Sequence, residues 1–455
     1  MTMLQRIIAA LVAIVLAVLA FFWFSGKHAE LKLSKPLTAI GSATPLEVLV
    51  SDPAGLKRFS VVVQQNGQSQ TVFEDQNKSK QMARTFSFPV GKQQAPFLKE
   101  GPAHIMVSAV SNDFRGATTS LEQDVTVILR PPTIVADGKQ HYINQGGAEL
   151  VVLDLGGNWT DAGVHVANYT STSFPMPGEA DASSHRFSLF VYPWDVSPDT
   201  IPLAFVRNTA GTEVTTTFWT KVFPKKFRSS DINVKEENLR KVVGELDPEG
   251  SGDLVERFVK LNRDLRKANT EQIYALRTHT ENKILWSGPF IPVKGTRESF
   301  FADRRSYYYQ GKKIDEQIHL GYDLAQTSNT PVKAANSGKV IYADRLGIYG
   351  NCVIIDHGYS LQSLYGHMSR IIVKVGDAIQ KEQQIGISGS TGMAFGDHVH
   401  FSMLADGYQI DPKEWWDEHW IHDRILSKIG PAGAVDAEKP PAQKPAAHKA
   451  KKKRH

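Results

Sequence analysis

The chain has 455 residues, of which 41% are hydrophobic and 22% are charged; this length suggests about three domains, and this composition is typical of folded proteins. The formal net charge is +5, and the seven lysine and arginine residues and two acidic residues that follow residue 430 account for that whole excess. Because the body of the chain is close to neutral, its charge argues against a nucleic-acid-binding surface.

The N-terminal region carries eighteen consecutive apolar residues, IIAALVAIVLAVLAFFWF, at positions 7–24. A helix of this length rises about 27 Å and nearly crosses the roughly 30 Å hydrocarbon core of a bilayer. The run ends in aromatic residues, which is a poor context for signal-peptide cleavage. We therefore predict that residues 1–27 are a short cytoplasmic tail and a transmembrane signal anchor, in contact with the lipid bilayer through residues 7–24. The body would lie outside the cytoplasm; a cleaved leader and a cytosolic body are the alternatives.

Short strand patterns separated by turn residues fill residues 28–130 and 131–228. In the first segment, apolar runs flank Asn66-Gly67, a dipeptide typical of a two-residue β-hairpin. The second segment follows Arg130-Pro131-Pro132 and contains another expected hairpin around the loop NTAG. We predict two β-sandwich-like modules of roughly 100 residues each.

The hydrophobic period lengthens to three and four residues between positions 231 and 268, which predicts two helices. Asp253 and Glu256 have the spacing of a capping box at the start of the second helix. The intervening DPEGSGD resembles part of a calcium loop, but Phe258 stands where that loop needs a carboxylate, so we predict a turn. Residues 229–284 are therefore expected to form a helical hairpin that links the β modules to the C-terminal part.

Strand patterns with Gly-rich turns return over residues 285–429, which predicts a β-sheet domain. The remaining segment, residues 430–455, is rich in Ala, Pro and Lys. Such a composition cannot bury enough apolar surface to fold, so we predict a disordered basic tail.

Four histidines and one aspartate stand out in the C-terminal domain: HLGYD contains His319 and Asp323, SLYGHMS contains His367, and GDHVHF contains His398 and His400. Side chains of a strand alternate between its two faces, so both histidines of H-x-H would point to one side. Each motif by itself is common, and the ordered set is what indicates a site.

This donor set suits a catalytic zinc ion, which commonly takes three N/O ligands and leaves one position for water. His319, Asp323 and one histidine of H-x-H would bind the metal. The other one and His367 would remain for acid–base work or oxyanion stabilisation, and the spacing allows either order within H-x-H. A structural zinc site would usually include cysteines, whereas the chain has one, Cys352, which we expect to be a buried hydrophobic residue. The remaining conspicuous histidines are predicted to be structural or surface residues: His279, His357, His419 and His422.

Seven ordered motifs within residues 299–415 resemble those of the lysostaphin-type, or LytM-like, zinc endopeptidases. They are SFFADRR, HLGYDLA, TPVKAANSGKVIYA, GIYGNCVIIDHG, SLYGHMS, VKVGDAIQKEQQIGISGSTG and GDHVHF. The resemblance implies an open antiparallel β-sheet with a groove over one zinc ion. It also implies His319, Asp323 and His400 as zinc ligands and His367 and His398 as catalytic residues.

Three positions depart from the usual family pattern: Ala302 replaces the glycine of F-G-x-R, and Asp397 and Val399 replace the proline and the leucine of G-P-H-L-H-F. None of these changes removes a ligand or a catalytic histidine. Some family members have lost zinc ligands and activate other hydrolases, whereas this chain keeps all five residues. Gly350 and Asn351 are predicted to line the substrate groove, with a plain turn as the alternative.

The resemblance implies peptidoglycan as the substrate, cut at cross-links or stem peptides, and we favour a D,D-type cross-link over a pentaglycine bridge. We therefore predict a mainly β, membrane-anchored zinc endopeptidase. The alternative is a non-catalytic envelope protein that binds peptidoglycan or activates another cell-wall hydrolase. An envelope or divisome protein could bind the β modules, and the modules or the helical hairpin could cover the groove until a partner moves them.

Overall fold

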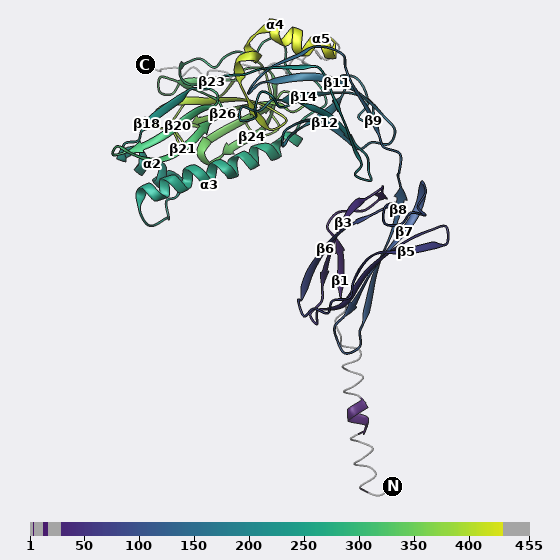
Figure 1. Cartoon of the computed structure of the whole chain (residues 1–455). Helices are drawn as coiled ribbons and strands as arrows, with labels where there is room; N and C mark the ends of the chain where they lie inside the picture. The colour runs from purple at the N-terminus through teal and green to yellow at the C-terminus, as the bar shows by residue number, and fades with distance from the viewer. Residues whose placement is uncertain (1–2, 4–11, 17–28, 431–455) are drawn as a thin grey trace, which may run out of the picture. The chain divides into compact units, whose positions relative to one another are not determined.

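The computed structural model describes residue 3, residues 12–16 and residues 29–430 (Figure 1). Residues 7–11 and 17–24 of the predicted membrane anchor, and residues 431–455 of the predicted tail, lie outside this described part. Within it, no helix is long and apolar enough to span a membrane. The described chain divides into two compact units, which contain residues 29–135, 155–162 and 204–216, and residues 136–154, 163–203 and 217–430.

The first unit contains a β-sandwich. Its smaller sheet has the order β1–β3–β6, with β1 (Glu30–Leu33), β3 (Thr44–Ser51) and β6 (Ala83–Val90). Its larger sheet has the order β2–β8–β7–β4–β5, with β2 (Ala39–Ile40), β8 (Thr118–Val127), β7 (Gly101–Ser111), β4 (Leu56–Gln65) and β5 (Gln68–Asp75). Between the sheets, Phe59 of β4 stacks on Phe86 of β6 with 4.1 Å between ring centroids. The β character predicted for residues 28–130 is confirmed.

Both predicted hairpins form within this unit. Strands β4 and β5 pair as far as Gln65 and Gln68, and the turn residues Asn66 and Gly67 have φ angles of 49° and 79°. Two positive φ values define the type I′ turn, which matches the right-handed twist of the strands and suits Asn-Gly. The NTAG loop likewise joins two neighbouring strands, β15 (Leu203–Arg207) and β16 (Glu213–Thr217).

The predicted second module, residues 131–228, does not form a unit of its own. The first unit takes most of β9 (Thr133–Ala136), β15 and β16. The second unit takes all or most of β10 (His141–Asn144), β11 (Ala148–Gly156), β12 (Asp161–Val166), β13 (Tyr169–Pro175), β14 (His185–Val191) and β17 (Thr220–Phe223).

Burial explains this division. Leu150 of β11 and Phe187 of β14 belong to the same hydrophobic core as the C-terminal domain. There Phe187 packs edge-on against Tyr359 at 4.9 Å between centroids. The buried Lys428 also donates from Nζ to Glu149 Oε1 at 2.7 Å. The two segments are therefore parts of one packed unit, which strand patterns in the sequence cannot reveal.

The second unit is built on an eight-stranded sheet with the order β19–β22–β30–β26–β25–β24–β28, and β31 pairs with β30. Its strands are β19 (Thr296–Ser299), β22 (Tyr322–Ala325), β30 (His398–Ala405), β26 (Leu361–Met368), β25 (Asn351–Asp356), β24 (Gly338–Arg345), β28 (Ala378–Ile379) and β31 (Tyr408–Ile410). All of its pairings are antiparallel. The central strand β26, which carries His367, is buried along its whole length.

Two smaller sheets accompany it. One has the order β18–β20–β21, with β18 (Ser229–Asn233), β20 (Asp303–Tyr309) and β21 (Lys312–His319); the other has the order β23–β29–β27, with β23 (Pro331–Lys333), β29 (Gln384–Ile387) and β27 (Arg370–Ile371). The segment predicted to be a helical linker or hairpin, residues 229–284, therefore begins with a strand, β18.

The predicted helical hairpin consists of α2 (Glu236–Leu246) and α3 (Leu254–Ala275), which contact each other. Asp253 caps α3, because its side chain accepts from the backbone N–H groups of Val255 and Glu256, and DPEGSGD forms the turn between the helices. The shorter helical segments are η1 (Leu276–Thr278), η2 (Gly347–Tyr349), η3 (Pro412–Trp416), α4 (Glu418–Ile421), η4 (His422–Leu426) and α5 (Ser427–Ile429).

Candidate metal centre and active site

Adjacent strands of the eight-stranded sheet bring the five predicted site residues together. Asp323 on β22 lies directly opposite His400 on β30, and on the other side Gly366 on β26 lies opposite His400, so that His367 follows next to it. His319 ends β21, three residues before β22 begins. Residues that are up to 81 positions apart in the chain therefore meet at one place because of sheet register.

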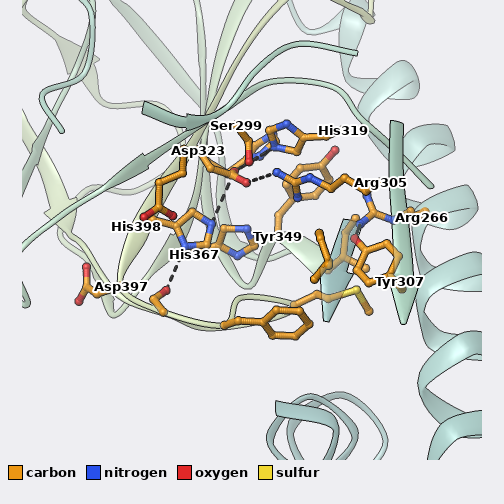
Figure 2. Close-up of a pocket in the computed structure, with 17 residues that line it drawn as sticks. Arg266, Ser299, Arg305, Tyr307, His319, Asp323, Tyr349, His367, Asp397 and His398 are labelled. Atoms are coloured by element: carbon orange, nitrogen blue, oxygen red, sulfur yellow. Dashed lines mark hydrogen bonds and ion pairs between the residues drawn. The ribbon is translucent and has the colours of Figure 1, made fainter. Parts of the chain in front are cut away.

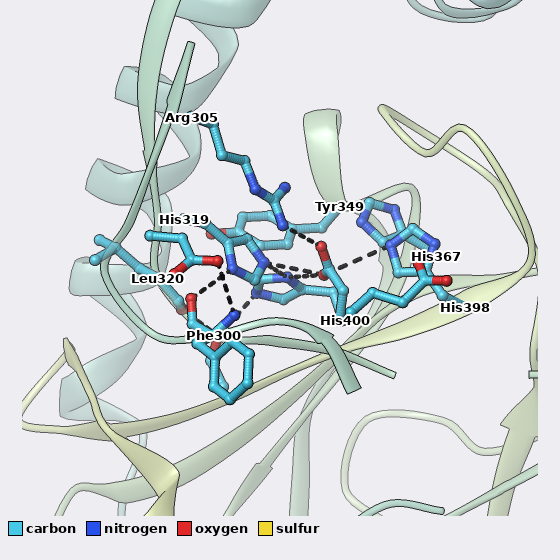
Figure 3. A network of polar contacts seen from close by, with 12 residues as sticks. Phe300, Arg305, His319, Leu320, Tyr349, His367, His398 and His400 are labelled. Atoms are coloured by element: carbon cyan, nitrogen blue, oxygen red, sulfur yellow. Dashed lines mark hydrogen bonds and ion pairs between the residues drawn. The ribbon is translucent and has the colours of Figure 1, made fainter. Parts of the chain in front are cut away.

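Three of these residues converge most tightly (Figure 3). His319 Nε2 lies 2.9 Å from Asp323 Oδ1 and 3.0 Å from His400 Nδ1, and His400 Nδ1 lies 3.1 Å from Asp323 Oδ1. All three residues are at most 6% exposed. Three potential ligand atoms thus form a nearly equilateral, buried triangle.

The outer hydrogen bonds determine which ring nitrogens carry protons. His319 Nδ1 lies 3.1 Å from the carbonyl of Phe300, which can only accept, so this Nδ1 is protonated and Nε2 has its lone pair free. The hydroxyl of Ser402 donates to the carbonyl of Leu320 at 2.6 Å. It therefore accepts from His400 Nε2 at 2.9 Å, which leaves the lone pair on His400 Nδ1. Two imidazole lone pairs and a carboxylate oxygen thus face one another.

This arrangement fits a zinc ion. Lone pairs that face each other repel unless a cation lies among them. Ligands of a tetrahedral zinc ion with bonds of about 2.0–2.1 Å are separated by about 3.3 Å, which is close to the three distances of 2.9 to 3.1 Å. A second hydrogen bond that orients each ligating histidine is also typical of metal sites. His319, Asp323 and His400 could therefore hold zinc with no change of fold.

Close backbone approach depends on Gly321 in HLGYD. A Cβ atom at this position would lie 2.6 Å from each of His400 Nε2, Phe401 O and Ser402 Oγ. Any side chain here would displace His400 or the serine that orients it. The glycine is thus required by the arrangement of the candidate metal ligands.

The other two histidines, His367 and His398, form a pair beside the triangle, which we call the acid–base pair. Their ring centroids are 4.6 Å apart. His367 Nδ1 lies 2.9 Å from the carbonyl of Thr391, and His398 Nδ1 lies 3.0 Å from the carbonyl of Gly396. Since carbonyls only accept, each Nδ1 is protonated, and each Nε2 is the atom that can take up or release a proton. His398 Nε2 lies 3.5 Å from Asp323 Oδ1.

Burial and charge set the protonation of the cluster. Burial lowers the pKa of His319 to about 4 and also lowers the pKa of His400, so both rings are neutral at neutral pH, as metal binding requires. Burial lowers the pKa of His367 well below its ordinary value, and His398 and His400 add to this effect. Burial opposes charge on His398 as well, but the Asp323 carboxylate outweighs it and raises the pKa of His398.

Asp323 is held in its charged form by several partners. Burial alone would raise its pKa, but His319, Arg305 and His398 hold the pKa well below its ordinary value. Arg305 donates from Nη2 to Asp323 Oδ2, which is the oxygen that does not face the two ligand histidines. The carboxylate therefore offers Oδ1 to a metal and Oδ2 to the guanidinium.

All five residues line a pocket of about 380 Å³ (Figure 2). Gly350 and Asn351 do not belong to its lining. Instead, Gly350 has a φ of 59°, and Asn351 Nδ2 donates to the carbonyl of Met368 at 2.9 Å. The structure thus places Gly350 at the end of η2 and Asn351 at the start of β25, and a contact with substrate remains a prediction.

The helical hairpin supports the site in a way that no sequence motif indicated. Lys241 of α2 donates from Nζ to the carbonyls of Ser390 and Ala394 at 2.5 and 2.9 Å. Glu245 Oε1 accepts from the backbone N–H of Gly392 at 2.6 Å. Because Thr391 in the same loop accepts from His367 Nδ1, helix α2 fixes the loop that orients one member of the acid–base pair.

Helix α3 supports a second loop. Asn269 is 5% exposed, and its Oδ1 accepts from the backbone N–H of Ile348 at 2.9 Å. The next residue, Tyr349, packs against the His400 ring with 5.1 Å between centroids. Of the supporting residues, only Ser402 had a signal in the sequence, since it continues the alternation of His398 and His400 on β30.

The other predictions for single residues agree with the structure. His357 is fully buried, with Nδ1 lying 2.7 Å from the Ser337 carbonyl and Nε2 lying 2.8 Å from Ser363 Oγ, and this is a structural role. Cys352 is also fully buried, and burial raises the pKa of its thiol. His422 is exposed and pairs with its neighbour Asp423.

Comparison with known proteins identifies the domain. Residues 317–412 match the model of peptidase family M23. The chain is 36% identical to the peptidoglycan DD-endopeptidase ShyA of Vibrio cholerae over 93 residues, and this alignment covers 20% of the chain and 22% of ShyA. It is 34% identical to the murein hydrolase activator EnvC of Escherichia coli over 127 residues, and this alignment covers 28% of the chain and 28% of EnvC. The matches thus span about a quarter of these relatives or less.

Among solved structures, the catalytic domain of the antimicrobial peptidase lysostaphin from Staphylococcus simulans is similar. It is 26% identical, and the alignment covers 31% of this chain and 94% of that domain with a TM-score of 0.20.

Proposed function

The chain contains an M23 peptidase domain at residues 317–412, and from this premise we propose that it is a zinc endopeptidase that hydrolyses peptide bonds in peptidoglycan. The observation that carries the proposal is the triangle of His319 Nε2, Asp323 Oδ1 and His400 Nδ1, in which hydrogen bonds to the outer atoms leave all three lone pairs facing inward. We propose one zinc ion per domain at this triangle. The DD-endopeptidase name of the relative ShyA supports a D,D-type cross-link as the bond that is cut.

When bound, zinc would lower the pKa of its water to about 7 and polarise the scissile carbonyl. The acid–base pair lies next to the triangle, and both Nε2 atoms are available because each Nδ1 is held by a carbonyl. The neutral Nε2 of His367 is suited to accept a proton from the attacking water. The Nε2 of His398 is suited to stabilise the oxyanion or to protonate the leaving amine.

The test uses the purified full chain with measured zinc content and isolated peptidoglycan. We expect about one zinc ion per chain and release of cleaved muropeptides. His319→Ala should lose both zinc and activity. His367→Ala should keep zinc but lose about 10²- to 10⁴-fold in turnover, which is the usual contribution of a general acid or base. Full activity of the His319→Ala protein would refute the proposed site.

The match to the activator EnvC supports a second candidate function, in which the protein binds peptidoglycan or a hydrolase without cutting. Zinc-loaded wild-type protein that releases no muropeptides, but stimulates another hydrolase, would favour it. Retention of all five site residues favours catalysis.

We further propose that residues 7–24 anchor the protein in the cytoplasmic membrane, with the peptidase domain outside the cytoplasm, and that an envelope or divisome protein binds the β modules. Cell fractionation and protease accessibility in spheroplasts would test the first proposal, because degradation only after lysis would contradict it.

A further inference from the structure

The two carboxylate oxygens of Asp323 face different groups. Oδ1 faces the triangle and His398, whereas Oδ2 pairs with Arg305. Figure 2 shows Arg305, Arg266 and Tyr307 on one side of Asp323 and the acid–base pair on the other. The pocket therefore has a histidine side and an arginine side, with the candidate metal centre between them.

The arginine side is built from two different elements. Arg305 comes from β20 and its side chain is 12% exposed. Arg266 comes from α3 and is half-buried, and both line the pocket. Tyr307 lines the same pocket, and its hydroxyl accepts from Arg266 Nη2 at 3.5 Å. Two guanidinium groups on one side of the pocket make this side cationic.

Glu298 and Asp397 also line the pocket, but no ion pair joins either of them to these two arginines. In the described part of the chain, Asp323 is the only carboxylate that forms an ion pair with either of them, and Asp323 is itself a candidate metal ligand. Arg266 Nε donates to the neutral amide of Asn262 at 2.9 Å. The nearby Asp315 is bound by Arg263 and by Asn262. A guanidinium has five N–H donors, so both arginines retain donors for a ligand.

We propose that Arg305 and Arg266 form a carboxylate-binding subsite, and that the substrate is a peptide with a free carboxylate close to the bond that is cut. Guanidinium groups match the planar geometry of a carboxylate and bind it with paired hydrogen bonds. When zinc occupies Oδ1 of Asp323, a carboxylate of the substrate would provide the negative charge that pairs with the two arginines. This proposal rests on the proposed peptidase function, whereas the binding measurement below does not depend on turnover.

The subsite is tested by binding to the zinc-loaded full chain carrying His367→Ala, which prevents turnover. The probes are three synthetic stem-type tetrapeptides: one with free carboxylates, one amidated at the C-terminus and one amidated at the side-chain carboxylate. Isothermal titration calorimetry should show at least tenfold weaker binding of one amidated peptide. If amidation at the C-terminus weakens binding, the α-carboxylate is the group that is recognised; if amidation of the side chain weakens it, the side-chain carboxylate is.

Adding Arg266→Gln should abolish this discrimination, and Arg266→Lys should restore part of it. Arg240→Gln is the matched control, because Arg240 lies on the neighbouring helix, is 69% exposed and pairs with Glu236. Equal affinities for all three peptides, or no measurable binding of any, would overturn the subsite. Discrimination without any cleavage of muropeptides by the wild-type protein would instead support the subsite and reject the peptidase function.

Discussion

Gly321→Ala is the substitution that tests the metal centre most directly. A single added methyl group would have to occupy space 2.6 Å from His400 Nε2, from the backbone carbonyl of Phe401 and from Ser402 Oγ. The Phe401 carbonyl oxygen belongs to the backbone of the buried strand β30, so it cannot move away. The methyl group must therefore push His400, the proposed ligand, and Ser402, whose hydroxyl orients it.

The geometry gives the size of the effect. An ordinary contact begins at 3.4 Å, so a separation of 2.6 Å requires a displacement of about 0.8 Å. Zinc–ligand distances tolerate about ±0.2 Å. Loss of an orienting partner alone typically costs 10- to 100-fold in metal affinity, so displacement of the ligand itself should cost at least about 100-fold, or about 2.7 kcal/mol. Overpacking adds about 1–3 kcal/mol of lost stability.

The assay is a competition titration of zinc against a chromophoric chelator, with circular dichroism to monitor folding. Gly396→Ala is the control, because Gly396 lines the same pocket and its Cβ would meet nothing within 4 Å. We expect Gly396→Ala to bind zinc like the wild type. Wild-type zinc affinity of a folded Gly321→Ala protein would refute the assignment of His400 as a ligand held through Ser402.

Three further predictions concern groups outside the triangle. Lys241→Met should lower kcat by about 10- to 100-fold with little change in KM, because the loop that orients the acid–base pair loses its support. Lys241→Arg should retain most activity. A rise in the activity of Lys241→Met would show that the helical hairpin inhibits the site instead. Burial raises the pKa of Glu414 from 4.5 in the unfolded chain to about 7. Its contribution to the free energy of unfolding is therefore fully present below pH 4.5 and is lost as pH rises through 7. The difference in free energy of unfolding between the wild type and Glu414→Gln, measured by thermal unfolding from pH 4 to 8, should change by on the order of 3 kcal/mol, and a difference that stays constant with pH would contradict this. Lys428→Met removes the short ion pair of the buried Glu149 and leaves it only the 3.9 Å pair with Arg424. This should cost about 3 kcal/mol, and the double change with Glu149→Gln should recover much of it. Equal melting temperatures for all three proteins would mean that the pair does not hold the two segments together.

The sequence alone determined the local elements and the chemistry of the site. Asn66-Gly67 specifies a type I′ turn because few other dipeptides tolerate two positive φ values. Asp253 specifies a helix start because its side chain can satisfy backbone donors of the first turn. The H-x-x-x-D and H-x-H spacings marked four of the five predicted site residues, and the motif SLYGHMS marked the fifth, His367.

Tertiary structure decided the rest, because it depends on contacts between distant residues that leave no local period. Leu150 and Phe187 joined the core of the C-terminal domain, although their strands follow the same pattern as those of the sandwich. The roles of Lys241 and Arg266 were likewise invisible, since each is an ordinary charged residue on a helix until the fold places it against the pocket or its loop. The family resemblance implied His400 rather than His398 as the ligand. The structure supplies a physical basis for this choice, because the hydroxyl of Ser402 keeps the proton of His400 on Nε2. The lone pair on His400 Nδ1 therefore points toward the candidate metal centre.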